Sequence, residues 1–488
     1  MGHTAQNTST KIPEGSLALG GIGCHGLAAV VMDRDTLQFM PMGHEGSPWV
    51  SAGQFVDRPH VFQNMGDGTY SHSGVLAIRA AVAAKANITY KLLYNDAVAM
   101  TGGQPVEQQI TPVDMVNQLL SEGVRPVRLV SDHPEQYEGI RLPAQASLHH
   151  RDELDSLQRA LRETKGVTAI VYEQTCAAEK RRRRKRGLIP DPDERVFINA
   201  EVCEGCGDCS VQSNCLSVVP LETEFGRKRA IDQSSCNKDY SCVKGFCPSF
   251  VTVTGARIAM RSTAHPGALD QLVAELPEPA IAPLGERGCN ILVGGIGGTG
   301  VLTIGALLGM AAHLEGRGCT ILDMTGMAQK GGAVTSHIRI GADPAAIYSA
   351  RLSEAMSDVL LACDMIVGAS PGVLKTLRPG QTAVLLNTDV APTGSFQSDR
   401  KADLHEGRMR AAIVEALDGG ALDELDASWL ATALTGDSIG TNVLMLGYAA
   451  QRGLLPVSIA SLQQAIRLNG SFVDGNLRTF ALGRVAAR

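Results

Sequence analysis

The chain has 488 residues, of which 44% are hydrophobic and 4% aromatic, with 53 glycines and a formal net charge of −6. This length is sufficient for two to four domains with their own cores, and the slightly acidic balance gives no overall field that would attract nucleic acid or a membrane. Residues 1–16 contain no apolar signal segment, and no run of eighteen apolar residues follows. We therefore expect a soluble, cytoplasmic protein that binds neither nucleic acid nor membrane, and the glycine-rich composition favours layered α/β domains.

Two glycine-rich stretches lie near the N-terminus, GGIGCHG (20–26) and MGHEGSPW (42–49). They are either packing turns or the ends of strands. In the second case the same sheet edge brings Cys24 and His25 to a bound cofactor.

A strand–helix–strand pattern follows. An apolar stretch ends at Gly66-Asp67-Gly68, the Ala-rich stretch GVLAIRAAVAAKAN has helical spacing, and a second apolar stretch ends at Asn95. Because parallel strands of such a unit end at the same edge of the sheet, where ligands bind, Asp67 and Asn95 are expected to converge. Their oxygens are suitable ligands for Mg²⁺ that also binds a diphosphate.

Gly-Asp-Gly, a later Asn and the following TGGQ (101–104) resemble the thiamine-diphosphate motif. The resemblance implies that Asp67 and Asn95 bind Mg²⁺ through side-chain oxygens and Ala97 through its backbone carbonyl. Gly66 and Gly68 would let the backbone approach the diphosphate. A simple turn is the alternative.

The basic run EKRRRRKRG (179–187) is expected to be a solvated linker. It contains no interleaved aromatic residues, which disfavours nucleic-acid binding. Steering of an acidic protein partner is the other alternative.

Seven of the twelve cysteines lie between residues 203 and 247. Scattered disulfides would not cluster in this way, and a reducing cytosol disfavours them. Cys203, Cys206 and Cys209 have the spacing of a bacterial iron–sulfur run, and a second run ends in Cys247-Pro248. We assign Cys203, Cys206, Cys209 and Cys247 to one [4Fe–4S] cluster.

A second cluster, either [4Fe–4S] or [3Fe–4S], would be held by Cys215, Cys236 and Cys242. Asp239 stands where the middle cysteine of the second run is expected. As a ligand it would hold iron less tightly than a thiolate does. Zinc is the rival metal, since Cys-x2-Cys pairs also build zinc sites.

The Pro-rich stretch 263–288 predicts a linker. A strand, a glycine turn, a helix and a second strand are expected over 290–324, and further repeats of strand and helix at 364–370 and 382–390. The result would be a Rossmann-like domain.

The glycine turn Gly295-x-Gly297-x2-Gly300 together with Asp323 fits a dinucleotide fingerprint. The next stretch, 325–341, is not typical of NAD-binding domains because it contains a Lys330-Gly331-Gly332 turn directed back at the sheet edge. An NAD-linked iron–sulfur oxidoreductase remains one alternative, and the family resemblance described next implies instead an α/β domain without a nucleotide.

These three parts, in this order, resemble the 2-oxoacid:ferredoxin oxidoreductases, and most of all the long, fused indolepyruvate ferredoxin oxidoreductases. The resemblance implies thiamine diphosphate, Mg²⁺ and one or two [4Fe–4S] clusters as cofactors. It implies oxidative decarboxylation of a 2-oxoacid, indolepyruvate or another arylpyruvate, to an acyl-CoA. Coenzyme A and ferredoxin would be the partners, and the basic run could dock an acidic ferredoxin.

The resemblance also gives the domain plan: residues 1–186 bind the diphosphate and Mg²⁺, 187–262 form a ferredoxin-like domain, 263–288 a linker and 289–488 a gamma-type domain. Family members carry a further pyrimidine-binding domain with an activating glutamate. We expect another subunit in an oligomer to supply it, and the chain alone to be inactive. The alternative is an incomplete fragment that acts in electron transfer or assembly.

Overall fold

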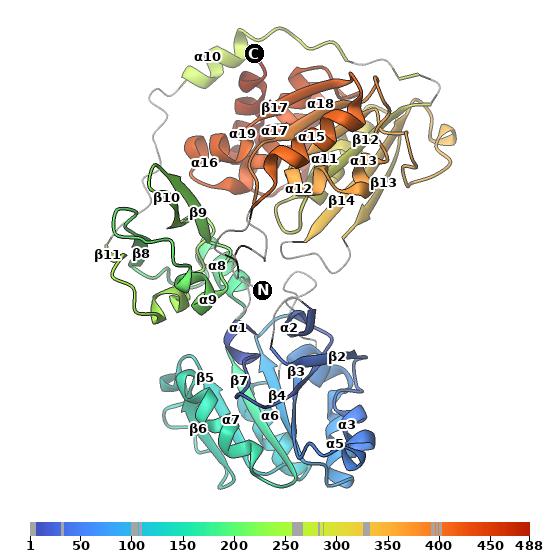
Figure 1. Ribbon diagram of the computed structural model, residues 1–488. Coiled ribbons are helices and arrows are strands. Elements are labelled where there is room, and N and C mark those ends of the chain that lie inside the picture. Colours follow the sequence, from blue (N-terminus) through green and yellow to red (C-terminus); the bar gives the residue numbers. More distant parts are fainter. Residues whose placement is uncertain are drawn as a thin grey trace. The chain divides into compact units, whose positions relative to one another are not determined.

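The computed structural model describes residues 6–30, 34–98, 106, 110–255, 267–281, 284–285, 287–325, 332–391, 396, 399 and 403–488. The chain divides into two compact units (Figure 1). The N-terminal unit is Met1–Gly255 together with Gly394–Arg400, and the C-terminal unit is Ala256–Thr393 together with Lys401–Arg488. None of the helices in the described ranges combines the length and the apolar run that a membrane crossing requires.

A parallel sheet forms the centre of the N-terminal unit. Among the described residues of this unit, seven strands pair in the order β2-β1-β3-β4-β7-β5-β6, and all neighbours are parallel. The strands are β1 (Ala18–Gly21), β2 (Thr36–Met40), β3 (Val61–Gly66), β4 (Ile88–Tyr94), β5 (Val127–Ser131), β6 (Ala146–His150) and β7 (Val167–Glu173). The fold class is α/β, as the sequence predicts.

Helices connect these strands. They are α1 (Gln6–Ser9), the 3₁₀ turn η1 (Cys24–Gly26), α2 (Leu27–Val30), α3 (Ser47–Ala52), α4 (Asp67–Thr69), the π-helical turn η3 (Tyr70–Gly74), α5 (Val75–Ala83), α6 (Pro112–Ser121), the 3₁₀ turn η6 (Arg151–Glu153), α7 (Leu154–Arg162) and α8 (Ala177–Lys185). The expected strand–helix–strand unit is β3, α5 and β4.

Side chains alternate between the two faces of this sheet, which is why its strands read as continuous apolar runs. On one face Leu92 packs with Ile78 of α5 and Leu119 of α6. On the other face Leu93 packs with Leu161 of α7. The sheet is therefore covered on both faces, and polar side chains at its strand ends are left for binding.

The basic run 179–187 lies largely in helix α8, and several of its arginines have partners elsewhere in the unit. Arg183 forms an ion pair with Asp96 at 2.9 Å, in the loop that follows β4. Arg184 donates to the backbone carbonyl oxygen of Asn237 at 2.7 Å. The expectation of a solvated linker is therefore wrong, because these arginines bind partners that are distant in the sequence.

The cysteine-rich segment, residues 187–255, forms two small antiparallel pairs, β8 with β11 and β9 with β10. Its elements are β8 (Glu194–Ile198), α9 (Asp208–Ser213), β9 (Val218–Thr223), β10 (Gly226–Ile231), the 3₁₀ turn η7 (Ser241–Lys244) and β11 (Phe250–Thr254). The loop of the first cysteine run lies against β10, since a Cβ atom at Gly205 would lie 2.4 Å from the carbonyl oxygen of Arg227.

The C-terminal unit contains a mixed sheet. In its described part six strands pair in the order β13-β14-β12-β15-β16-β17. They are β12 (Cys289–Ile296), β13 (Gly318–Met324), β14 (Ala333–Gly341), β15 (Val359–Ala362), β16 (Ala383–Asn387) and β17 (Ala421–Leu425). β14 is antiparallel to both of its neighbours, whereas β12, β15, β16 and β17 are parallel to one another.

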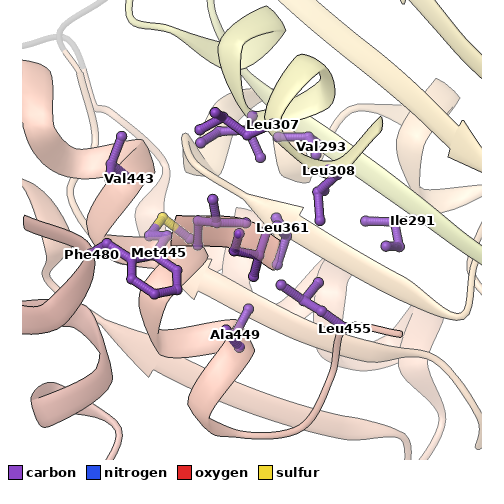
Figure 2. Close-up of a cluster of buried hydrophobic side chains, with 14 of the residues drawn as sticks. Ile291, Val293, Leu307, Leu308, Leu361, Val443, Met445, Ala449, Leu455 and Phe480 are labelled. Carbon is purple, nitrogen blue, oxygen red and sulfur yellow. The ribbon is translucent and has the colours of Figure 1, made fainter. Parts of the chain in front are cut away.

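Two apolar layers cover this sheet. The helices are α10 (Ala268–Ala274), α11 (Val301–Leu314), α12 (Met365–Gly368), α13 (Pro371–Leu374), α15 (Glu406–Leu417), α16 (Ala427–Thr435), α17 (Thr441–Gln451), α18 (Ile459–Asn469) and α19 (Val473–Ala486). Figure 2 shows the larger layer, in which Leu361 of β15 lies among side chains that include Leu308, Met445 and Phe480. α17 and α19 cross closely, since a Cβ atom at Gly483 would lie 1.9 Å from the carbonyl oxygen of Leu444.

Two expectations for this unit need correction. The predicted linker 263–288 contains the helix α10, which begins after the αL residue Gly267. The stretch 364–370 is helix α12, capped by the Asp364 side chain, and the strand lies just before it at Val359–Ala362. The second error arises because a short apolar run has no periodicity that separates helix from strand.

Candidate cofactor sites

Asp67 and Asn95 lie together at the carboxyl edge of the parallel sheet. Asp67 begins directly after β3, and its carboxylate accepts hydrogen bonds from the backbone N–H of Asn95 at 2.8 Å and of Gly68 at 2.9 Å. Ala97, in the same loop as Asn95, is buried. Two parallel neighbouring strands thus bring both side chains to one point, since β3 and β4 end at the same edge.

The Asp67 carboxyl is buried, and this shifts its ionisation. Burial raises the pKa of Asp67 to about 6, although the backbone N–H groups that it accepts from oppose the shift. A cation bound to the carboxylate would remove this penalty. A carboxylate has about four lone-pair sites. Asp67 accepts from the two backbone N–H groups and, at 3.5 Å, from Asn95 Nδ2, so an oxygen position remains for a metal ion.

Several other polar atoms at this edge are buried without a partner. Asn95 Oδ1, His25 Nε2, Glu45 Oε1 and both amide atoms of Asn64 have no hydrogen-bond partner among the described residues. Buried polar groups are almost always paired, so a group of unpaired ones indicates a ligand that pairs them. Burial lowers the pKa of His25 to about 4, so its imidazole is neutral at neutral pH.

The glycines leave room for such a ligand. A Cβ atom at Gly68 would approach only Val98, at 3.9 Å, and one at Gly66 only the His25 ring, at 3.5 Å. His25 therefore lies against the Gly66 backbone, while Cys24 beside it is buried in η1. The space, the unpaired amide oxygen and the carboxylate together fit a magnesium ion with a diphosphate.

Glu45 and Asn64 belong to this edge. The sequence places Glu45 at a glycine-rich strand end in the diphosphate-binding part, whereas Asn64 was assigned no role. The Glu45 side chain lies 3.2 Å, through Oε1, from the position of a Cβ atom at Gly21, where β1 ends. A signal for Asn64 was available, because Gln63 and Asn64 are polar residues inside an otherwise apolar buried strand. The TGGQ stretch (101–104) lies outside the described residues.

In the cysteine-rich segment, the loop of the first run folds around Cys203, Cys206 and Cys209. Cys203 Sγ accepts from the backbone N–H of Gly205 at 3.4 Å. Burial raises the pKa of Cys209 to about 11, and the charges of Cys203 and Cys206 add to this effect. These three predicted ligands are therefore neighbours, whereas Cys247 has the Ser249 hydroxyl at 3.0 Å as its recorded contact.

The second set of cysteines is also brought together. Burial raises the pKa of Cys242 to about 12, and Cys215 and Cys236 are among the thiols whose charges contribute. Asp239 acts on Cys215 in the same way. The mutual effect of these charges indicates that the three thiols are near one another.

Asp239 has further partners that the sequence prediction did not foresee. Its carboxylate accepts hydrogen bonds from Arg151 and from Gln174, both at 3.1 Å, and from the Ser241 hydroxyl. Burial would raise the pKa of Asp239, but Arg151 and Ser241 outweigh it and hold that pKa below its ordinary value. Asp239 therefore ties the cysteine-rich segment to the parallel sheet.

The described side chains do not form a binding site for a single metal ion. Across the ranges that the structure describes, no three His, Cys, Asp or Glu side chains are grouped closely enough to hold one ion. An iron–sulfur cluster spreads its ligands farther apart than one ion does, and a magnesium–diphosphate site takes most of its ligands from phosphate and water.

The glycine turn of the C-terminal unit lacks the strand arrangement of a dinucleotide site. In a dinucleotide-binding domain the strand that carries the ribose-binding acid lies directly beside the strand that precedes the glycine turn. Here β14 separates β12 from β13. Asp323 on β13 is therefore two strand spacings, about 10 Å, from β12. The turn itself is packed, since Asn442 donates to the carbonyl oxygen of Thr299 at 3.2 Å. Lys330 and Gly331 lie outside the described residues, and Gly332 accepts from the Gly297 N–H at 2.8 Å.

Comparisons with known proteins concern the C-terminal unit of the chain. The family model described as "Pyruvate ferredoxin/flavodoxin oxidoreductase" matches residues 290–486. Indolepyruvate oxidoreductase subunit IorB of Thermococcus kodakarensis is 31% identical over 202 residues, which are 41% of this chain and 96% of that protein. The same subunit of Pyrococcus horikoshii is 30% identical over 202 residues, with the same shares. The matched unit is thus that of an oxidoreductase subunit.

The chain belongs to the 2-oxoacid:ferredoxin oxidoreductase family. Among solved structures, the gamma subunit of the keto/oxoacid ferredoxin oxidoreductase from Geobacter sulfurreducens is 20% identical, with a TM-score of 0.30. The similarity covers 41% of this chain and 98% of that one.

Proposed function

We propose that this chain is a component of a thiamine-diphosphate-dependent 2-oxoacid:ferredoxin oxidoreductase. It would oxidatively decarboxylate indolepyruvate or another arylpyruvate to the acyl-CoA and pass the electrons through iron–sulfur clusters to ferredoxin. The observation that carries the proposal is the convergence of Asp67 and Asn95 at the sheet edge, in the same compact unit as the clustered cysteines. The names of the matched relatives support indolepyruvate as the substrate.

Thiamine diphosphate would supply an electron sink that lets the bond between the keto carbon and the carboxylate break. Asp67 and Asn95 would hold Mg²⁺ through side-chain oxygens, and Ala97 through its carbonyl oxygen. Gly66 and Gly68 leave space for the diphosphate. Support comes from the unpaired Asn95 Oδ1 and from the cation that the buried Asp67 carboxylate requires.

His25 and Cys24 would line the same cofactor. Since burial keeps the His25 imidazole neutral, its unpaired Nε2 can donate or accept one hydrogen bond without adding charge. This suits a ligand that is already charged at its diphosphate end.

The cysteines would hold the electron carriers. One-electron carriers suit an oxidation whose two electrons leave one at a time, which a nicotinamide does not allow. The first set is Cys203, Cys206, Cys209 and Cys247, and the second is Cys215, Cys236 and Cys242 with Asp239. Within each set the thiols are near one another, with the exception of Cys247, and this supports the assignment.

A partner subunit would supply the pyrimidine-binding side and the activating glutamate. Support for a multi-subunit enzyme comes from the relatives, which are named as subunits. The proposed domains are 1–186 for the diphosphate, 187–262 for the clusters, 263–288 as a connecting segment with α10, and 289–488 as the gamma-type domain. A reducing compartment, the cytoplasm, is proposed because iron–sulfur thiols must stay reduced.

The test is indolepyruvate-dependent reduction of a viologen dye by the anaerobically purified holoenzyme with thiamine diphosphate, Mg²⁺ and coenzyme A. We expect Asp67→Asn and Cys206→Ser to abolish dye reduction. The matched control Asp323→Asn changes an exposed carboxylate on β13 and should leave the rate unchanged. Full activity of Asp67→Asn would refute the proposed thiamine site.

A further inference from the structure

Arg229 is a cation buried beside the first set of cysteines. It lies on β10, and its side chain is among the largest that are fully buried, with 1% exposed. Neither its Nε nor either of its Nη atoms has a hydrogen-bond partner among the described residues. A buried, unpaired guanidinium costs several kcal/mol. The N–H groups of Arg229 are therefore free to donate hydrogen bonds to a bound group.

The cysteine loop lies directly on the strand that carries Arg229. A Cβ atom at Gly205, between Cys203 and Cys206, would lie 2.4 Å from the carbonyl oxygen of Arg227. The loop between Cys203 and Cys206 therefore lies against the backbone two residues before Arg229. This close approach explains why a glycine, with φ +68°, occupies position 205.

The thiols of the first run lie near enough to Arg229 for their charges to act on it. Burial lowers the pKa of Arg229, and the negative charges of Cys209, Cys203 and Cys206 oppose that shift. All three thiols of the first run therefore interact with this one cation.

Phe396 covers one face of the guanidinium. The Phe396 ring centroid lies 4.1 Å from the Arg229 Cζ, and Phe396 is fully buried. Such stacking stabilises the cation and excludes water from that face. The N–H groups, which lie in the plane of the guanidinium, stay available at its edge.

We infer that Arg229 raises the reduction potential of the cluster held by the first run of cysteines, by offering its unpaired N–H groups to the sulfur atoms of that cluster. The inference rests on the proposed function, since it requires an iron–sulfur cluster at this site. Reduction adds one electron and no proton, so the negative charge of the cluster increases by one. A nearby buried cation therefore stabilises the reduced form more than the oxidised form. The electron comes from oxidation of the 2-oxoacid and leaves to ferredoxin.

The experiment is a redox titration with dithionite, followed by EPR, on the anaerobically purified full chain. Iron and acid-labile sulfide are measured in the same samples. The variants are Arg229→Met, which removes the charge at similar volume, and Arg229→Lys, which keeps it. The matched control is Lys228→Met, which removes one charge from the next residue of the same strand, on its other face.

For Arg229→Met we expect the reduction equilibrium of one cluster to shift at least tenfold toward the oxidised form, about 59 mV for one electron. Arg229→Lys should restore most of this shift, and Lys228→Met should show none. Unchanged potentials at full iron content, or equal shifts in Arg229→Met and Lys228→Met, would overturn the inference. If Arg229→Met loses iron, retention of iron by Arg229→Lys supports the role of the charge, and loss in both overturns it. Wild-type protein without iron and sulfide would instead refute the proposed function itself, and the inference with it.

Discussion

Asp67 is a buried carboxyl whose ionisation opposes folding until a cation binds. Burial raises its pKa to about 6 from the ordinary 3.8. The difference corresponds to about 3 kcal/mol. Because the pKa of Asp67 is higher in the folded state, the protonated carboxyl stabilises the folded protein relative to the ionised one. This stabilisation is fully present below pH 3.8 and is lost as the pH rises through 6. About half of the loss falls between roughly pH 5 and pH 7.

Asp67→Asn removes this titration. Between pH 5 and pH 7, the unfolding free energy of the ligand-free wild type should fall by about 1.5 kcal/mol relative to that of the variant. The assay is urea unfolding in a Trp429→Phe background, followed by tryptophan fluorescence. Of the 2 tryptophans, Trp49 then remains, and it packs against the core of the parallel sheet.

Mg²⁺ with thiamine diphosphate should reverse the effect. At about 100 times the dissociation constant, the ligand stabilises the wild type by about 2.7 kcal/mol. The gain should be smaller at pH 5 than at pH 7, because the cation needs the ionised carboxylate. Asp67→Asn should gain little at either pH, and Asp323→Asn should behave like the wild type. If Asp67→Asn showed the pH dependence of the wild type, or gained equal stability from the ligand, the reasoning would be refuted.

Two further predictions concern packing and the second cluster. Gly483→Ala places a methyl group 1.9 Å from the Leu444 carbonyl oxygen. It should destabilise the C-terminal unit by at least about 1–3 kcal/mol in thermal unfolding. The control Gly407→Ala, whose added methyl group meets nothing within 4 Å, should be neutral or stabilise by up to about 1 kcal/mol. Asp239→Cys should retain iron longer against a chelator, while loss of the Arg151 pair lowers stability by about 1–3 kcal/mol. Unchanged iron retention would show that Asp239 is not a ligand.

Local patterns allowed the N-terminal site to be predicted. Buried parallel strands appear as apolar runs, and glycines mark their ends, so β3, α5 and β4 followed from the sequence. The meeting of Asp67 and Asn95 then follows from the geometry of parallel strands. The run Cys203, Cys206 and Cys209 was recognisable for the same reason, since its spacing is local.

Non-local pairing could not be predicted. Nothing in the sequence shows that β14 lies between β12 and β13, because strand order depends on contacts across the whole unit. The partners of α8 and of Asp239 are likewise distant along the chain. Arg229 resembled any other basic residue of a hairpin, and only the fold places it against the cysteine loop.

The most direct test of this account is the iron and acid-labile sulfide content of the anaerobically purified chain. One or two clusters predict between four and eight irons per chain, an estimate from cluster type, with a matching amount of sulfide. Cys203→Ser and Cys236→Ser should each remove part of that iron. Zinc in place of iron, or iron without sulfide, would contradict the claim that this chain carries electrons from a 2-oxoacid to ferredoxin.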